Sequence, residues 1–295
     1  MSASGAGSIG VAPGETAGRA REEPPRFATI VVVGGGCYGS YYVRQLTRAR
    51  EAGAIRFERL LVVDRDARCR VARGREAALA EQTAAGGPPQ LDDAFIADVA
   101  PRHFDAVEIE YAQWDEFFAG YLGRAASDPQ TTAGDAIVPS PLMPHLVYHW
   151  LLARARARWQ GRSVGTVPLA RAPNTPWERA AADGSHYVSF AEWMCPINCI
   201  EPALCPEIRG PRTWSMPAAV RAYAEAERER GEPLAGPILL HCVHRAYGVG
   251  MFDTGAVVAA DSELTRLVTA GARRVLVGTV SHCHGALNLM EIGGG

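Results

Sequence analysis

The first 160 residues alternate short apolar runs with longer helix-prone segments. The run from Phe27 to Val33 is continuous and rich in β-branched residues, the pattern of a parallel strand buried on both faces. Further strands are predicted at 59–63, 106–110 and 135–138, and helices at 40–50, 65–82, 114–124 and 145–159. This alternation predicts a parallel sheet with helices packed on its faces.

The alternation stops between residues 160 and 236, where prolines and cysteines concentrate and one helix, 218–230, is predicted. It resumes with strands at 238–242 and 274–280 around a helix at 256–270. The simplest fold is α/β, a doubly wound, mainly parallel sheet of about six strands in the order 3-2-1-4-5-6, with a cysteine-rich insertion between strands 4 and 5. The predicted parts are a disordered tail at 1–26, an α/β part at 27–159, the Cys/Pro-rich insertion at 160–236, and the completion of the sheet at 237–295.

A glycine-rich turn follows the first strand and opens the first helix. Its sequence, Gly34-x-Gly36-x-x-Gly39, is the dinucleotide-binding fingerprint in the required strand–turn–helix context. The first glycine allows the tight turn, the second lets the backbone approach a pyrophosphate at the helix N-terminus, and the third permits close packing of helix on strand. Cys37 lies inside this turn and would border the cofactor, either as a small buried residue or as a reactive thiol.

An acidic residue, Asp64, closes the second strand 25 residues after Gly39. A carboxylate there accepts hydrogen bonds from the ribose hydroxyls and favours NAD, while Arg65 and Arg68 keep NADP open. Residues 27–140 resemble the Rossmann NAD(P)-binding superfamily, including the nucleotide-binding subunits of potassium uptake systems. The resemblance implies a Rossmann-like sheet. The alternative is a domain of this shape that binds another nucleotide, such as a flavin or AMP, or none.

Three cysteines lie close together in the insertion, in a stretch stiffened by prolines: Cys195, Cys199 and Cys205. Their spacing matches neither the paired cysteines of zinc fingers nor the ferredoxin run, although it shares the compact thiols and the Cys-Pro ending of the latter. The sequence leaves three alternatives for these cysteines: an iron–sulfur cluster, a zinc site, or unliganded thiols. Three thiols need a fourth ligand, and Cys242 and Cys283, after the predicted fifth and sixth strands, are the candidates.

Half of the eight histidines end the same two strands. The candidates for catalytic proton donation are His241, His244, His282 and His284. Because the carboxyl ends of parallel strands border the ligand crevice, we expect them at the same sheet edge as the glycine-rich turn. Glu201, inside the cysteine run, is interpreted as a solvated loop carboxylate.

Two further histidines, His145 and His149, lie four residues apart on a predicted helix. Both are able to ligate a metal ion, but no glutamate lies between them in an H-E-x-x-H arrangement. The pattern therefore favours a position of both histidines on the surface of the helix or in the wall of the ligand crevice.

Charge and composition narrow the class of protein. The formal net charge of −2 gives no reason to expect nucleic acid as a partner, and no apolar run approaches the ~20 residues that span a bilayer. Without an export signal, the seven cysteines are expected to be reduced thiols or metal ligands in a cytoplasmic protein.

Together these features predict an NAD(P)-binding, iron–sulfur-containing oxidoreductase-like protein with its cysteine-rich loop near the nucleotide crevice. The expected partners are the dinucleotide and either a small-molecule substrate or an electron-transfer partner. The sequence does not decide whether the protein forms a homo-oligomer. One alternative is a non-catalytic nucleotide-sensing regulatory subunit with a structural zinc or thiol site. Another is a Rossmann-like enzyme whose insertion holds zinc while the histidines perform catalysis.

Overall fold

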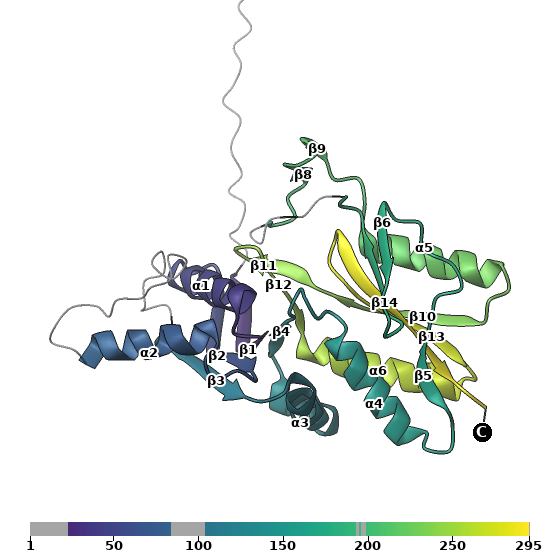
Figure 1. Cartoon of the computed structure of the whole chain (residues 1–295), viewed down its shortest axis with the longest axis horizontal. Helices are drawn as coiled ribbons and strands as arrows, with labels where there is room; N and C mark the ends of the chain where they lie inside the picture. The colour runs from purple at the N-terminus through teal and green to yellow at the C-terminus, as the bar shows by residue number, and fades with distance from the viewer. Residues whose placement is uncertain (1–22, 84–103, 193–194, 196–198, 295) are drawn as a thin grey trace, which may run out of the picture.

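The computed structural model describes residues 23–83, 104–192, 195 and 199–294. Within these residues the strands form two six-stranded sheets and one short hairpin, with helices between and around the sheets (Figure 1). Nearly all of the predicted tail at 1–26 lies outside the described residues. No helix in the described part of the chain combines the length and apolarity needed to cross a bilayer.

The first sheet contains the four strands that were predicted for the first half of the chain, in parallel. Its strand order is β11-β12-β4-β1-β2-β3, with β12 antiparallel to β4 and β11 antiparallel to β12. The strands are β1 (Arg26–Val33), β2 (Arg56–Asp64), β3 (Val107–Tyr111), β4 (Ala136–Val138), β11 (Val243–Ala246) and β12 (Val249–Asp253). The helices that connect its parallel strands are α1 (Cys37–Glu51), α2 (Arg70–Thr83) and α3 (Trp114–Ser127), followed by a 3-10 turn, η2 (Pro129–Thr132).

The second sheet is mixed and comes from the second half of the chain. Its order is β10-β13-β14-β7-β6, and β5 also pairs with β14. The strands are β5 (Val164–Val167), β6 (Trp177–Ala180), β7 (His186–Ser189), β10 (Leu234–His241), β13 (Arg274–Val280) and β14 (His284–Ile292). The remaining elements are α4 (Leu146–Arg158), α5 (Met216–Glu229), α6 (Thr254–Thr269) and the hairpin of β8 (Leu204–Cys205) with β9 (Gly210–Pro211), which stands away from both sheets in Figure 1.

The predicted strands are present, but the prediction of one sheet in the order 3-2-1-4-5-6 was wrong. The expected fifth and sixth strands, 238–242 and 274–280, correspond to β10 and β13, which pair with each other in the second sheet. The place beside β4 is taken by β12, an antiparallel strand that the pattern did not predict. An apolar run indicates that a strand is buried, but its pairing partner depends on contacts remote in sequence.

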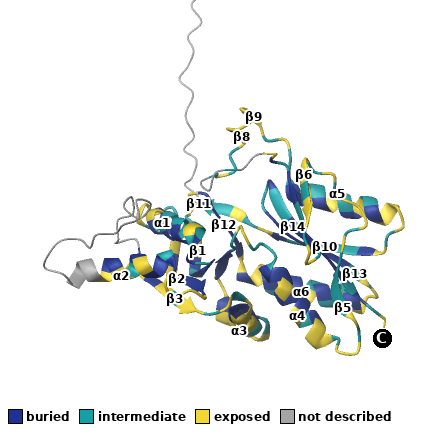
Figure 2. Cartoon of the chain, in the orientation of Figure 1, coloured by how far each residue is buried: buried dark blue, intermediate teal, exposed yellow. Residues whose placement is uncertain are grey.

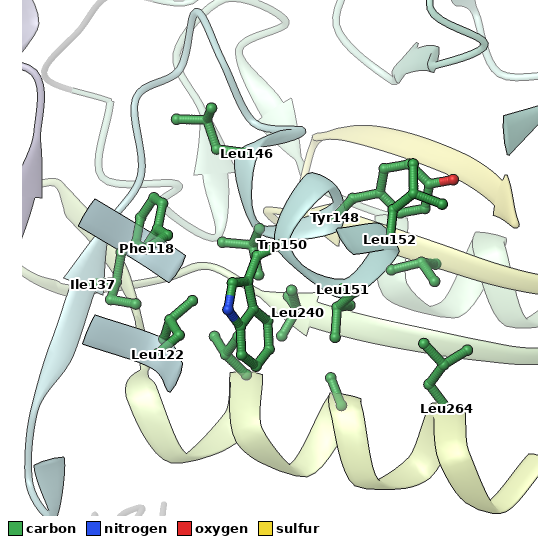
Figure 3. Close-up of a cluster of buried hydrophobic side chains, with 14 of the residues drawn as sticks. Phe118, Leu122, Ile137, Leu146, Tyr148, Trp150, Leu151, Leu152, Leu240 and Leu264 are labelled. Carbon is green, nitrogen blue, oxygen red and sulfur yellow. The ribbon is translucent and has the colours of Figure 1, made fainter. Parts of the chain in front are cut away.

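Three hydrophobic clusters hold these layers together. The largest lies between the two sheets and contains α3, α4 and α6, with Phe118, Leu151 and Leu264 among its buried side chains (Figure 3). A second cluster packs α1 and α2 on the other face of the first sheet, and a third packs α5 on the other face of the second sheet. Burial is accordingly concentrated in the strands and on the inner helix faces, while the outer faces of α2, α3 and α5 are exposed (Figure 2). Because one cluster contacts both sheets, they share a core.

A buried ion-pair group also links two of the central helices. The carboxylate of Asp261 in α6 accepts hydrogen bonds from Arg154 and Arg158 of α4 at 2.9–3.3 Å. Asp261 is 4% exposed. Burial raises the pKa of this carboxyl, but the two guanidinium groups outweigh that effect and lower it overall.

Candidate functional site

Two positions of the glycine-rich turn require glycine, Gly34 for its backbone conformation and Gly39 for its packing. Gly34 has a φ of +88°, which is the left-handed region that favours glycine. A Cβ atom on Gly39 would lie 1.7 Å from the carbonyl oxygen of Gly34, so α1 rests directly on the turn. The N–H of Gly34 donates to the carbonyl of Val63 at 2.9 Å, which fastens the turn to β2. These are the roles assigned to the first and third glycines of the fingerprint.

The middle glycine of the turn lies in open space at the start of α1. Gly36 is the N-cap residue. Among the described residues no side chain caps the helix, and a Cβ atom on Gly36 would have no neighbour within 4 Å. Cys37, the first helical residue, is exposed rather than buried. The first N–H groups of a helix lack intrahelical partners and carry partial positive charge. This end of α1 therefore has the shape and the polarity of an anion-binding site.

Asp64 holds the turn from the end of β2. One carboxylate oxygen accepts a hydrogen bond from the N–H of Gly35 at 2.6 Å, and the other accepts from the N–H of Asp66 at 2.8 Å. Asp64 is 8% exposed. Asp64 therefore shapes the turn whatever else it binds, a role that the sequence did not indicate. Gly35 was missed too: a Cβ atom there would lie 2.5 Å from the Sγ of Cys69.

The glycine-rich turn follows β1, the strand at which the strand order of the first sheet reverses. β1 lies between β2 and β4, so the turn lies where open α/β sheets generally have their ligand crevice. Val33, Pro139, Ser140 and Pro144 line a narrow hollow at this end of the sheet. On the other side of the turn, the indole of Trp114 donates to the carbonyl of Val63 at 3.1 Å, and the Arg65 guanidinium lies over the Trp114 ring.

A second group of polar residues gathers around the carboxylate of Glu201. We call it the Glu201 cluster; its members are Glu201, His241, Cys242, His244, His282, Cys283 and His284. One oxygen of Glu201 accepts a hydrogen bond from the backbone N–H of His282 at 3.1 Å, and the other lies 4.0 Å from Nδ1 of His244. The side chain of Glu201 is 13% exposed, so its interpretation as a solvated loop carboxylate was wrong.

Neighbouring side chains orient the rest of the cluster. The Oγ of Ser189 in β7 lies 2.9 Å from Nδ1 of His284, and the indole N–H of Trp214 donates to Sγ of Cys283 at 3.2 Å. Glu201 itself has a φ of +50°, an uncommon conformation for a residue with a side chain. Its carbonyl accepts a hydrogen bond from Arg212, which holds the loop in place.

The electrostatics of the cluster favour neutral imidazoles and protonated thiols. Burial lowers the pKa of His241, His244 and His284, and the charge of Glu201 opposes this effect without cancelling it. Burial raises the pKa of Cys242 to about 12, with Glu201 adding to the shift, and burial also raises the pKa of Cys283. In addition, Nδ1 of His244 is buried and has no hydrogen-bond partner. Shifted pKa values in one polar cluster are typical of functional sites.

The three cysteines of the run have different surroundings. Cys199 is half-buried and lies within electrostatic range of Cys283, whereas Cys205 is buried in the β8–β9 hairpin. Cys195 is half-buried, and its neighbours in the run are outside the described residues. Among the described residues no three thiols lie close enough together to share one metal ion. The iron–sulfur cluster stays a prediction.

The glycine-rich turn and the Glu201 cluster are linked through α1. Tyr42, in the second turn of this helix, interacts electrostatically with Cys242, and burial together with Cys242 raises the pKa of the Tyr42 phenol. Cys242 and His244 also pack against Gly250 of β12. The expectation that the histidines and the turn share the edge of one sheet was wrong for His241 and His284, because β10 and β14 belong to the second sheet, whereas His244 lies in β11 of the first sheet. They approach instead because the chain passes from β10 through Cys242 directly into β11 of the first sheet.

A family model matches about half of the chain. It is described as "Uncharacterized protein, C-terminal domain" and aligns with residues 147–293. The matched segment contains almost all of α4, the whole second sheet and every member of the Glu201 cluster, but not the glycine-rich turn. No curated protein and no solved structure matches the chain. The similarity thus covers the cluster and carries no statement about its chemistry.

Proposed function

We propose that this protein is an NAD(P)-dependent oxidoreductase that binds its dinucleotide at the glycine-rich turn and uses the Glu201 cluster for acid–base chemistry. The observation that carries the proposal is the turn itself. Gly39 packs on Gly34 without room for a Cβ atom, while the N-cap Gly36 faces open space. This combination leaves a helix N-terminus accessible to a pyrophosphate.

The order of the first sheet supports a Rossmann-like fold for this half of the chain. β3, β2 and β1 are parallel neighbours in that order, the arrangement of a mononucleotide-binding half, and β4 is parallel to β1 on its other side. The glycine-rich turn follows β1, the strand at which the order reverses. Dinucleotides bind in the crevice at this point in folds of this type.

Specific residues of the turn would hold the cofactor. The backbone at Gly36 and Cys37 would contact the pyrophosphate, and the end of β2 at Asp64 would border the ribose. Arg65 lies beside this position and is held over Trp114, so both NAD and NADP are included in the proposal. A nicotinamide dinucleotide, when bound, would accept or supply a hydride.

The Glu201 cluster would handle the accompanying proton. With lowered pKa values, His244 and His284 are neutral at pH 7, so each can accept a proton from a small-molecule substrate. Ser189 orients the ring of His284. Glu201 stabilises the protonated state of both imidazoles, because its negative charge raises their pKa values.

The decisive experiment adds a side chain at Gly36. An Asp at an N-cap position favours the helix, so Gly36→Asp is expected to fold, but its carboxylate occupies and repels the phosphate position. We expect NADH or NADPH to accept energy from tryptophan fluorescence in the unmodified protein and Gly36→Asp to weaken binding at least about tenfold, which corresponds to about 1.4 kcal/mol. Gly123→Ala, in α3 with no atom within 4 Å of the added Cβ, is the matched control. Equal affinities of Gly36→Asp and the unmodified protein would refute the proposed cofactor site.

The structure also favours one alternative role. Tyr42 of α1 interacts electrostatically with Cys242. A nucleotide bound at the turn would therefore influence the Glu201 cluster through α1, without any chemical reaction. A protein that binds the dinucleotide but oxidises or reduces none of a panel of small alcohols, aldehydes and amines would support the nucleotide-sensing role. Turnover that is lost in His244→Gln would support the oxidoreductase.

A further inference from the structure

A third group of potential ligands lies outside both regions. His145 and His149 come from the start of α4, and Asp183 comes from the turn between β6 and β7. One ligand atom from each of the three side chains can be chosen so that all lie within 4.8 Å of one another. Since 38 residues separate Asp183 from His145, only the folded chain brings the carboxylate to the histidine pair.

The helix aligns the two imidazoles. Residues four apart lie on the same face of an α-helix, and the ring centroids of His145 and His149 are 4.8 Å apart. His145 is the N-cap residue, and the N–H of His149 donates to its carbonyl at 3.0 Å, so the helical geometry is intact at the site. The pair therefore presents two nitrogen ligands in one direction.

Neighbouring groups hold the third ligand and one histidine in place. The Oδ1 of Asp183 accepts a hydrogen bond from the N–H of Ser185 at 2.9 Å, and Ser185 is anchored in turn by the amide of Asn288 at 2.8 Å. Nδ1 of His145 lies 3.1 Å from the hydroxyl of Tyr187. In the tautomer in which Nδ1 donates to that hydroxyl, Nε2 keeps a free lone pair. A hydrogen bond of this kind commonly orients metal-ligating histidines.

We propose that His145, His149 and Asp183 bind a divalent transition-metal ion, with zinc or ferrous iron as the fitting class. Two imidazoles and one carboxylate are a ligand set used for both metals, and three protein ligands leave positions open for water or a substrate oxygen. The set contains no thiol, which separates it from the cysteines considered above.

The test uses the full chain after chelation, titrated with cobalt as a spectroscopic substitute and with zinc by calorimetry. Cobalt bound by nitrogen and oxygen ligands lacks the thiolate charge-transfer absorption, so this site is distinguished from cysteine sites in the same sample. We expect His149→Gln and Asp183→Asn each to lose one equivalent of thiol-free metal binding. Tyr187→Phe, which keeps the ring but removes the hydroxyl, is expected to weaken binding about 10–100-fold.

The matched control is His186→Gln. His186 lies in β7 near the site, but its Nε2 pairs with Glu178 at 3.1 Å instead. The control is expected to retain the full stoichiometry, and circular dichroism checks that each variant is folded. Unchanged stoichiometry and affinity in folded His149→Gln and Asp183→Asn would overturn the proposal. This outcome is independent of dinucleotide binding, since none of the variants alters the glycine-rich turn.

Discussion

The carboxylate of Glu201 accepts a hydrogen bond from the backbone N–H of His282, 3.1 Å away and 81 residues along the chain. This contact ties the cysteine run to the β13–β14 connection. It also places one negative charge near three imidazoles with lowered pKa values, so the charge and the loop position can be tested separately.

Replacing Glu201 with glutamine tests the charge. The amide oxygen of Gln can still accept the hydrogen bond from His282, but the negative charge that raises the histidine pKa values is lost. We expect the pKa values of His241, His244 and His284 to fall further below the ordinary 6.5 in Glu201→Gln. Titration of the histidine ring protons by NMR measures the change. Unchanged titration curves would show that Glu201 does not face these rings.

The same histidines predict how stability depends on pH. Their pKa values are lower in the folded protein than the ordinary value of 6.5, so the unfolded chain binds more protons near and below that pH. The free energy of unfolding should therefore be highest above pH 6.5 and fall as the pH decreases through the folded-state values. Urea unfolding between pH 7.5 and 5.5 measures this slope. A flat profile in this window would contradict the burial of the cluster.

A methyl group at Gly39 should disrupt the first sheet. The added Cβ would lie 1.7 Å from the oxygen and 2.8 Å from the carbon of the Gly34 carbonyl, and a backbone clash cannot be relieved by a rotamer change. We expect Gly39→Ala to lower the free energy of unfolding by about 3 kcal/mol or more, at or above the upper end of ordinary overpacking. Gly123→Ala, in the open helical position, should instead stabilise by roughly 0.5–1 kcal/mol. Chemical denaturation of the two variants gives the comparison.

Removing the charge of Asp261 should loosen the contact between α4 and α6. Asp261→Asn leaves Arg154 and Arg158 without their anionic partner, and the carboxylate position is almost fully buried. Breaking a fully buried pair costs about 3–5 kcal/mol, and the partial exposure of both arginines reduces the expected loss to about 2 kcal/mol. Thermal and urea unfolding measure it. The loss should diminish toward low pH, because Asp261 becomes protonated there in the unmodified protein as well. A loss that does not change with pH would argue against the ion pair as its source.

Local features of the first half were predictable because their causes are local. The apolar run 27–33, the turn at Gly34 and the helix after it are encoded by neighbouring residues, and each is present in the structure. The strands β10 and β13 were likewise recognised as strands. Their sheet was not, because β12 occupies the position beside β4 and no short pattern encodes that competition.

The candidate sites likewise divide into residues that a local pattern reveals and contacts that form only on folding. The candidate residues were recognisable from the sequence: the glycine fingerprint, the histidines after two strands, and the pair His145 and His149. Contacts between distant segments bring Glu201 next to the histidines and Asp183 next to His145 and His149. The physical reason is that burial and proximity arise from contacts between segments far apart in the chain, whereas turn geometry and strand propensity arise within a few residues.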